Sequence, residues 1–369
     1  MRILIIGYMH PKFDKRVYRT VRSLSKFHEI IYQYWTDKDE KEYIDGNIKY
    51  MPIKYTKGTK GNPLKKLINR RPLDKKICDL VTNENYDILY MHHFLASRPL
   101  EPFKIAKKRN KKIVYDIHEY HPENFLEELE GIIGNLKIRT VWRFFKKQLE
   151  LSDMAIFVSQ EMRDDVVNKA NIDKGKTYII PNYANFIIKP DIQKKSKEIV
   201  LVGKVTRKIE DEKKILKSLI EKDFKFKIIG MDSKNFKDID HESTDFLPYE
   251  EMMKELSNVA FSLISYNEGR KQYNNNFKFA LPNKFYDSLA AGTPVIVKAS
   301  FVSMAKQVED LGLGVVIDPT ELKESVEKIT NAYKNYEGIL DNIEKHQKRF
   351  IWDEKKERKF VGLISNLPK

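Results

Sequence analysis

The sequence predicts two doubly wound α/β domains in one chain. Short apolar runs alternate with segments whose apolar residues recur at helical spacing, which is typical of parallel sheets covered by helices. The alternation stops at the polar, proline-containing segment 189–197 and then starts again, so that segment is predicted to be a linker. The 369 residues are too many for one ordinary core and suit two domains.

The first domain is predicted over residues 1–188. Its opening run, Arg2–Gly7, is continuously apolar, as in a strand that is buried on both faces of a sheet. Apolar residues from Val17 to Phe27 then recur at helical spacing, and a later helix is predicted at Leu136–Leu151. The remaining strands of this domain are predicted at Glu29–Trp35, Ile48–Ile53, Tyr86–Met91, Lys112–Ile117, Met154–Val158 and Tyr178–Ile180.

The second domain is predicted over residues 197–345, with strands at Glu198–Gly203, Phe224–Gly230, Val259–Ile264, Thr293–Val297 and Gly314–Ile317. The tail, 346–369, is charged but carries Phe350, Trp352, Phe360 and Leu363, so we expect a terminal helix that packs back on the first domain. Ligands of such sheets lie beyond the carboxyl ends of the strands. We therefore expect a ligand site in a cleft between the two domains.

The composition narrows the class of protein. No apolar run approaches the roughly 20 residues that cross a bilayer, and no signal-peptide core follows Met1, so we expect a cytoplasmic protein. The single cysteine, Cys78, excludes an internal disulfide and a multi-cysteine zinc site.

The net charge of +15 has two interpretations. It is typical of chains rich in Lys, Asn and Ile from AT-rich genomes, or it attracts an anionic membrane, substrate or nucleic acid. The excess is dense over 54–76, where Leu64, Leu67 and Ile68 share one helical face. That stretch is either a basic amphipathic segment on the inner face of the cell membrane or a solvated loop and helix.

Several motifs are absent from the sequence. It lacks G-x-G-x-x-G, G-x-x-x-x-G-K-[ST] and G-x-S-x-G, which disfavours a dinucleotide cofactor, a P-loop NTPase and an esterase-like nucleophile. Two D-x-D pairs, Asp37/Asp39 and Asp238/Asp240, could hold the divalent ion of a metal-dependent sugar transferase, but such pairs are common in charged chains. His118 and His121 are spaced so that a helix would place both on one face, but the proline that follows argues against a helix there. We expect neither a metal nor a cofactor.

The segment from Leu281 to Val295 carries the strongest local signal. A proline turn opens a short helix at Asn283, which we expect to be its N-cap, and Gly292 ends the helix in a left-handed cap. The start of a helix attracts anions, and Lys284 adds positive charge there. A buried, capped helix without a ligand is the alternative interpretation.

This segment resembles the donor-binding motif of family 4 glycosyltransferases, the large retaining group with the GT-B fold of two Rossmann-like domains. In that family a glutamate five residues before the helix-ending glycine contacts the donor ribose, and Asp287 holds that position here. Phe279 stands where an earlier glutamate contacts the donor sugar, which leaves the sugar undefined. The resemblance places the turn at Asn283 and Lys284 near the diphosphate.

Other stretches resemble the same family over nearly the whole chain. In the second domain, Lys204 with Arg207 or Lys208 resembles the grip on the diphosphate, and Tyr249 lies in the segment that reads the nucleobase. In the first domain, His118 takes the place of a histidine that contacts the donor sugar. His10, Asp14 and Glu119 are assigned to the acceptor side of the expected cleft.

The resemblance implies a metal-independent, retaining glycosyltransferase. Its donor is a UDP- or GDP-sugar, and its acceptor is a hydroxyl of a glycan or lipid-linked glycan in surface polysaccharide or glycoconjugate synthesis. Lys204, Arg207 and the helix start stabilise the leaving diphosphate, and His118 positions the sugar. The alternative is a nucleotide-sugar epimerase or transfer-inactive binding protein of the same shape. A nucleic-acid-binding protein would explain the charge, but we see no binding motif and expect no nucleic-acid partner.

Overall fold

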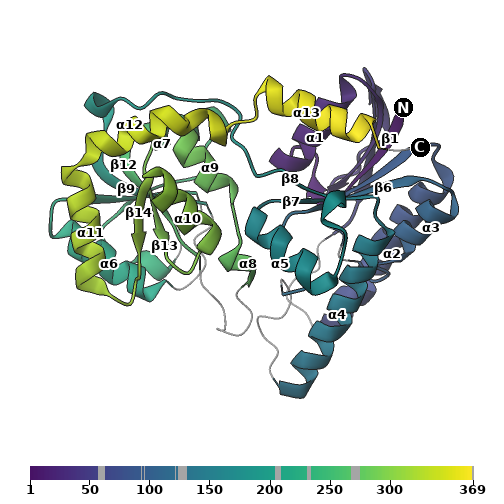
Figure 1. Cartoon of the computed structure of the whole chain (residues 1–369), viewed down its shortest axis with the longest axis horizontal. Coiled ribbons are helices and arrows are strands. Elements are labelled where there is room, and N and C mark those ends of the chain that lie inside the picture. The colour runs from purple at the N-terminus through teal and green to yellow at the C-terminus, as the bar shows by residue number, and fades with distance from the viewer. Residues whose placement is uncertain are drawn as a thin grey trace. The chain divides into compact units, whose positions relative to one another are not determined.

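The computed structural model describes residues 1–56, 63–92, 94, 96–120, 122–123, 131–203, 209–230, 234–266 and 275–367. The chain forms two compact units (Figure 1). The first comprises Met1–Ile180 with Glu354–Lys369, and the second comprises Pro181–Asp353. Each unit is a parallel or mainly parallel sheet with helices, so the predicted α/β class is confirmed.

Within the described residues, the first unit has an eight-stranded sheet in the order β3-β4-β2-β1-β5-β6-β7-β8. All pairings are parallel except that of β3 with β4. β3 carries no buried side chain and was not predicted from the apolar pattern. The strands are β1 (Arg2–Pro11), β2 (Glu29–Thr36), β3 (Tyr43–Asp45), β4 (Ile48–Lys54), β5 (Ile88–His92), β6 (Lys112–Ile117), β7 (Met154–Phe157) and β8 (Thr177–Ile179).

The helices of the first unit are α1 (Lys15–Ser25), α2 (Pro63–Asn83), α3 (Glu101–Lys108), α4 (Gly131–Leu151), α5 (Gln160–Ala170) and α13 (Glu354–Ser365). Asp14 is the N-cap of α1, and its carboxylate accepts the backbone N–H groups of Arg16 and Val17. Val17 is fully buried, but Phe27, which we expected on the same face, is 62% exposed because α1 ends two residues earlier.

The terminal helix α13 packs against α1 in the first unit (Figure 1). Its Phe360 and Ile364 are buried, and its Glu357 bonds Ser23 at 2.8 Å and Lys26 at 2.6 Å. The apolar residues of this charged tail therefore belong to two cores, since Phe350 is buried in the second unit instead.

The second unit has, within its described residues, a six-stranded parallel sheet in the order β11-β10-β9-β12-β13-β14. These strands are β9 (Ser196–Val202), β10 (Lys225–Ile229), β11 (Glu242–Thr244), β12 (Val259–Ile264), β13 (Val295–Lys298) and β14 (Gly314–Ile317). The helices are α6 (Glu210–Ile220), α7 (Tyr249–Asn258), α8 (Asn275–Lys278), α9 (Asn283–Ala290), α10 (Val302–Leu311), α11 (Leu322–Lys334) and α12 (Tyr336–His346).

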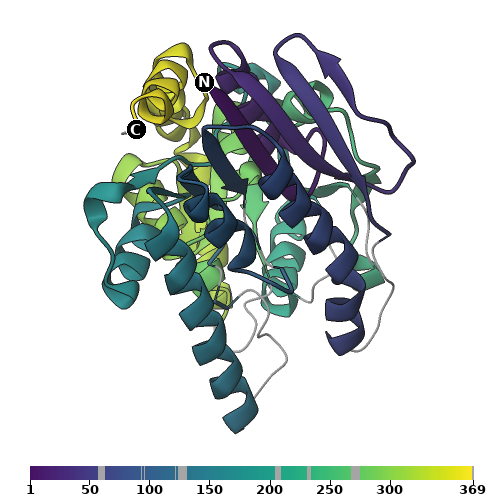
Figure 2. The same ribbon diagram turned by 90° about the vertical axis from the view of Figure 1, so that its right-hand side faces the viewer.

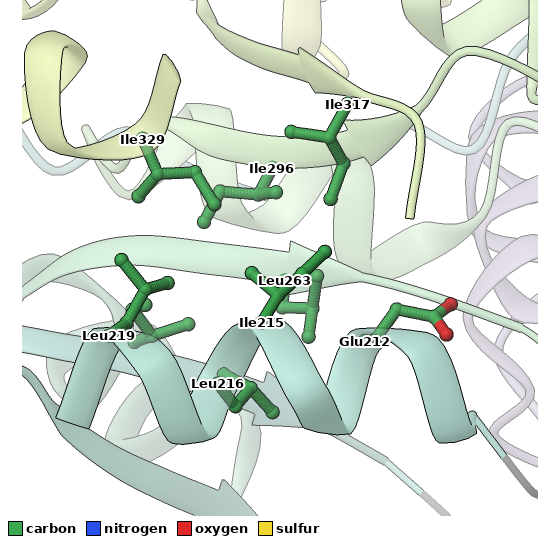
Figure 3. Close-up of a pocket in the computed structure, with 9 residues that line it drawn as sticks. Glu212, Ile215, Leu216, Leu219, Leu263, Ile296, Ile317 and Ile329 are labelled. Atoms are coloured by element: carbon green, nitrogen blue, oxygen red, sulfur yellow. The ribbon is translucent and has the colours of Figure 1, made fainter. Parts of the chain in front are cut away.

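The core of the second unit is apolar between α6 and the sheet (Figure 3). Isoleucine and leucine side chains surround a cavity of about 10 Å³, which is barely enough room for one water molecule. Glu212 is the one polar residue in that lining. The cavity is a packing gap and is too small for a nucleotide.

The boundary between the units lies earlier than the linker that the sequence suggested. Ala184 N–H donates to the Phe350 carbonyl, and Trp352 N–H donates to the Ala184 carbonyl, both at 2.9 Å. Ile188 N–H likewise donates to Ala290. Backbone hydrogen bonds therefore attach residues 184–188 to the second unit, although their sequence reads as the end of the first.

Candidate functional site

Three histidines lie at the carboxyl ends of neighbouring strands in the first unit. His10 is near the end of β1, His92 ends β5, and His118 follows β6. Because β1 pairs with β5 and β5 pairs with β6, the three rings meet at one edge of the sheet. The His118 ring centroid lies 4.9 Å from that of His10 and 5.1 Å from that of His92.

Asp14 joins this cluster through His10. The His10 Nδ1 atom lies 3.1 Å from Asp14 Oδ2, while Asp14 Oδ1 caps α1. Burial would raise the pKa of Asp14, but the hydrogen bond and charge of His10 outweigh it and lower the pKa to about 2. The structure thus brings together His10 and Asp14, which were predicted for the acceptor side, and His118, which was predicted to be catalytic. Glu119 is exposed beside them.

A buried ion pair between Arg16 and Asp116 lies next to the histidine cluster. Arg16 and Asp116 are 4% and 2% exposed, and Arg16 donates from Nε and Nη2 to Asp116 Oδ1 at 3.0 and 2.6 Å. Tyr90 donates to the other oxygen, Oδ2, at 3.0 Å. Arg16 Nη1 also donates to the Ile180 carbonyl at 2.6 Å. The carboxylate is therefore charge-compensated and held in one orientation.

His92 and Asp116 were missed by the sequence analysis. His92 Nδ1 lies 2.9 Å from His118 Nε2 and 3.5 Å from Asp116 Oδ2. Burial lowers the pKa of His92 to about 3, so its imidazole is neutral. The available signal was a histidine at the end of an apolar strand, one strand away from His118 in the sheet, but strand order was needed to use it.

His92, Asp116 and His118 are also the residues of this region that could hold a metal ion, with ligand atoms within 4.8 Å of one another. The geometry fits a hydrogen bond better. Two imidazole nitrogens on a tetrahedral zinc ion lie about 3.3 Å apart, from bond lengths of about 2.05 Å. Here they are 2.9 Å apart, and the Arg16 guanidinium already neutralises Asp116.

The second unit presents its own cluster around α9. Pro282, and not Asn283, is the N-cap residue of α9, because its extended φ and ψ of −73° and 160° precede the first helical residue. Asn283 is exposed at the first helical position. Gly292 has φ +74°, which confirms the predicted left-handed end of the helix.

Lys284 and Asp287 both lie on α9, but their side chains contact different neighbours. Lys284 Nζ lies 4.1 Å from the centroid of the Tyr266 ring and 3.3 Å from the Ser265 carbonyl oxygen. Asp287 is 4% exposed, and its Oδ1 accepts the Tyr249 hydroxyl at 2.7 Å. Burial, and then the Asp287 charge, raise the pKa of Tyr249 well above its usual value. Tyr249 and Asp287, which were both predicted to bind the sugar donor, are therefore hydrogen-bonded to each other.

This unit also contains a buried ion pair that the sequence did not predict. Lys298 Nζ lies 2.5 Å from Glu212 Oε1, with side chains 10% and 4% exposed. Ser265 donates to the same carboxylate, and Lys298 also bonds the Tyr266 carbonyl at 3.2 Å. The pair connects α6 to the carboxyl ends of β12 and β13. A lysine directly after the apolar run Val295–Val297 was its only sequence signal.

The remaining predicted residues divide into two groups. Lys204 and Arg207 lie outside the described residues, as do 57–62 of the basic stretch. Asp238, from a D-x-D pair, bonds both Lys213 and Lys217 at 2.7 Å, and Asp39 from the other pair lies 2.5 Å from Lys54. Lysine hydrogen bonds lower the pKa of Asp238. Both acids thus have lysine partners.

Comparisons with known proteins agree with this architecture. Residues 15–185 match the family model described as Glycosyltransferase Family 4, and residues 199–351 match that of the glucosyltransferase 3-like C-terminal domain. The two matched segments together span both units. No curated protein sequence matches the chain.

Several solved structures share the fold at low identity. Sucrose-phosphate synthase from Thermosynechococcus elongatus is 12% identical, with a TM-score of 0.70 over 100% of this chain and 99% of that one. HepE from Anabaena, in complex with UDP, is 13% identical, with a TM-score of 0.65 over 99% and 100%. A Listeria monocytogenes protein assigned as a UDP-N-acetylglucosamine 2-epimerase is 10% identical, with a TM-score of 0.63 over 99% and 95%.

The chain has two α/β units, each built on a sheet of mainly parallel strands, and it matches glycosyltransferase family models and structures. It is therefore a glycosyltransferase of the GT-B fold. Residues 15–185 match the family 4 glycosyltransferases that the sequence resembles, and residues 199–351, which contain the Leu281–Val295 segment, match the glucosyltransferase 3-like C-terminal domain. Among the described residues, no helix is long and apolar enough to cross a membrane.

Proposed function

We propose that the protein is a metal-independent, retaining transferase that moves a sugar from a nucleoside diphosphate to a glycan or lipid-linked hydroxyl. The observation that carries this proposal is the α9 cluster, where Tyr249 holds Asp287 in place and Lys284 lies at the helix start. Such a helix start favours a diphosphate, and the fixed acid suits a ribose hydroxyl. The UDP bound by HepE supports UDP as the nucleotide.

The proposed chemistry needs no enzyme nucleophile. The diphosphate gains negative charge as the glycosidic bond breaks, and Lys204, Arg207 and the amides at Asn283–Lys284 stabilise it. The leaving phosphate accepts the proton of the acceptor hydroxyl. His118 supplies the catalytic contact to the transferred sugar, while His10, Asp14 and Glu119 orient the acceptor. The lysine partners of Asp39 and Asp238 support a role for these acids outside metal binding.

The first test is thermal unfolding with a panel of nucleoside diphosphates and nucleotide sugars in the presence of chelator. A ligand at 100 times its dissociation constant adds about 2.7 kcal/mol to the folded state. We expect one nucleotide to shift the midpoint, and Lys204→Ala and Asp287→Asn to weaken that shift. Lys323→Ala is the matched control, since Lys323 is exposed on α11. A shift that requires divalent metal would refute the metal-independent proposal.

The epimerase alternative has a specific motivation in Phe279, which is buried where the family carries a donor-sugar glutamate. A transferase gives a glycosylated acceptor and free nucleoside diphosphate. An epimerase instead changes the configuration of the sugar while it consumes no acceptor. Product analysis with and without an acceptor mixture separates the two.

We further propose that the protein binds the surface of an anionic membrane, where a lipid-linked acceptor would reside. In the stretch 54–76, Arg71, Lys75 and Lys76 are exposed, while Leu73 and Ile77 face the core. That distribution supports a solvated charged face that attracts anionic lipid.

Helix α4 strengthens the membrane proposal. Ile132 and Leu136 are 80% and 58% exposed, and Arg139, Arg143 and Lys147 continue the same exposed face. Figure 2 shows the amino-terminal turns of α4, in teal, projecting away from the sheet. Apolar side chains beside basic ones are typical of segments that lie in a bilayer interface.

Co-sedimentation with vesicles tests this part of the proposal. We expect binding to vesicles that contain anionic lipid at low salt, release at high salt, and weaker binding of the Arg139→Glu/Arg143→Glu variant. Equal binding to neutral vesicles would refute the electrostatic attraction.

A further inference from the structure

The hydrogen bond between His92 and His118 requires one donor and one acceptor. The two nitrogens lie 2.9 Å apart, so one carries a proton and the other a lone pair. Either His92 Nδ1–H donates to His118 Nε2, or His118 Nε2–H donates to His92 Nδ1. The two arrangements place opposite tautomers on His118, and the surroundings of His92 distinguish them.

The first distinguishing feature is Asp116. Its Oδ2 lies 3.5 Å from His92 Nδ1, on the same side of the ring as His118. A proton on His92 Nδ1 faces this carboxylate favourably, whereas a lone pair there would face its negative charge. His118 Nε2 is farther from the same carboxylate, 3.9 Å from Oδ1, so the proton is better placed on His92. The Asp116 carboxylate is held in one orientation, because Arg16 and Tyr90 both donate to it.

The second feature is the far side of the His92 ring. His92 is fully buried, and its Nε2 has no hydrogen-bond partner in the described part of the chain. If Nε2 carried the proton, a buried N–H donor would be unsatisfied, which is rarer in proteins than an unsatisfied acceptor. Both features therefore favour a proton on Nδ1 and a lone pair on Nε2.

We propose that His92, held by Asp116, is a positioning residue that keeps the proton of His118 on Nδ1 and its Nε2 facing the protein. His118 then meets a ligand as an N–H donor through Nδ1 and does not act as a general base through Nε2. A donor suits a histidine that binds an oxygen of the transferred sugar. This use rests on the proposed function, but the tautomer itself does not.

Nitrogen-15 NMR of labelled histidine reports the tautomer directly, without substrate. The wild-type chain should show His118 with a protonated Nδ1 and an unprotonated Nε2, assigned by loss of signals in His118→Gln. His92→Leu removes the donor and should shift His118 toward the Nε2–H form. His92→Asn should restore the wild-type pattern, because the asparagine amide occupies the position of Nδ1 and donates in its place.

The activity readout follows the same pair of variants. His92→Leu should lower kcat by about 10-fold or more with little change in the KM for the donor, and His92→Asn should recover most of it. His241→Asn is the matched control, since His241 lies in the second unit, where its Nδ1 lies 2.8 Å from the Ile239 carbonyl oxygen.

The outcomes separate this inference from the proposed function. A wild-type His118 protonated on Nε2, or a tautomer that His92→Leu leaves unchanged, overturns the inference whatever the activity. Histidine signals that change with chelator or with added zinc would replace the hydrogen bond by a metal site and also overturn it. The proposed tautomer without any sugar transfer leaves the inference standing and refutes only the proposed function. If His92→Leu does not fold, the wild-type and His92→Asn spectra still decide.

Discussion

Replacing Arg16 with methionine should strongly destabilise the first unit. Methionine keeps much of the apolar stem but removes the hydrogen bonds from the guanidinium to Asp116 and to the Ile180 carbonyl. Asp116 is 2% exposed, so its charge would remain buried beside the Tyr90 hydroxyl without the charge of Arg16 to compensate it. Removing one partner of such a buried pair typically costs about 3–5 kcal/mol.

The cost of removing both charges from water determines how a second substitution, at Asp116, changes the stability of Arg16→Met. The favourable contact between Arg16 and Asp116 is offset largely by the cost of removing both charges from water. Arg16→Met combined with Asp116→Asn removes both charges, so the double variant should regain most of the lost stability. The variants therefore form a double-mutant cycle. The interaction between Arg16 and Asp116 is given by the coupling free energy of that cycle, and not by the stability lost in either single variant.

Calorimetry and urea unfolding measure these changes, with the two units treated as separate transitions. For a unit of this size, each kcal/mol lowers the midpoint by about 2–4 °C, so Arg16→Met should lower it by roughly 6–20 °C. The transition of the second unit should not move. A loss below about 1 kcal/mol, or a double variant as unstable as the sum of the singles, would refute a buried, coupled pair.

Further predictions concern both units. Gly292→Ala should cost about 1–3 kcal/mol, because φ is +74° and the new Cβ would lie 2.8 Å from the Pro190 nitrogen; Gly338→Ala, with nothing within 4 Å on a helix, should be neutral or stabilising in the same urea titration. Burial lowers the pKa of Lys195 to about 7. The unfolded state then binds more protons, so unfolding free energy should rise between about pH 7 and 10.5, and a flat profile equal to that of Lys195→Met would contradict this. Asp14→Ala should cost about 1 kcal/mol and Asp14→Asn much less, since asparagine also caps α1; equal losses in thermal unfolding would assign the effect to charge.

Local patterns were sufficient for much of the fold. Continuous apolar runs such as Arg2–Gly7 locate buried strands, because a parallel sheet hides both faces of each strand. The strands that the pattern missed, β3 and β11, are short and carry no buried side chain. The end of α9 was predictable for a local reason as well, since Gly292 can adopt a positive φ without a steric penalty.

The candidate site was only partly predictable. His118 and Asp287 could be identified because each sits in a motif with a recognisable spacing. His92 could not, since its importance comes from a ring 26 positions away, on the next strand of the sheet. The buried ion pair of Arg16 could not be predicted for the same reason, because its partner Asp116 lies 100 residues later in the chain.

The sequence by itself determined where most of the buried strands lie and indicated that the chain is a glycosyltransferase. Those properties depend on side-chain periodicity and short spacings, which operate within a few residues. Only the tertiary structure decided which strand ends are neighbours. Strand order brings His10, His92 and His118 to one edge of the first sheet. In the second unit, packing brings Tyr249 of α7 within hydrogen-bonding distance of Asp287 of α9. These contacts form between residues distant in the chain, because burial of the whole sheet, and not local propensity, selects the pairing of strands.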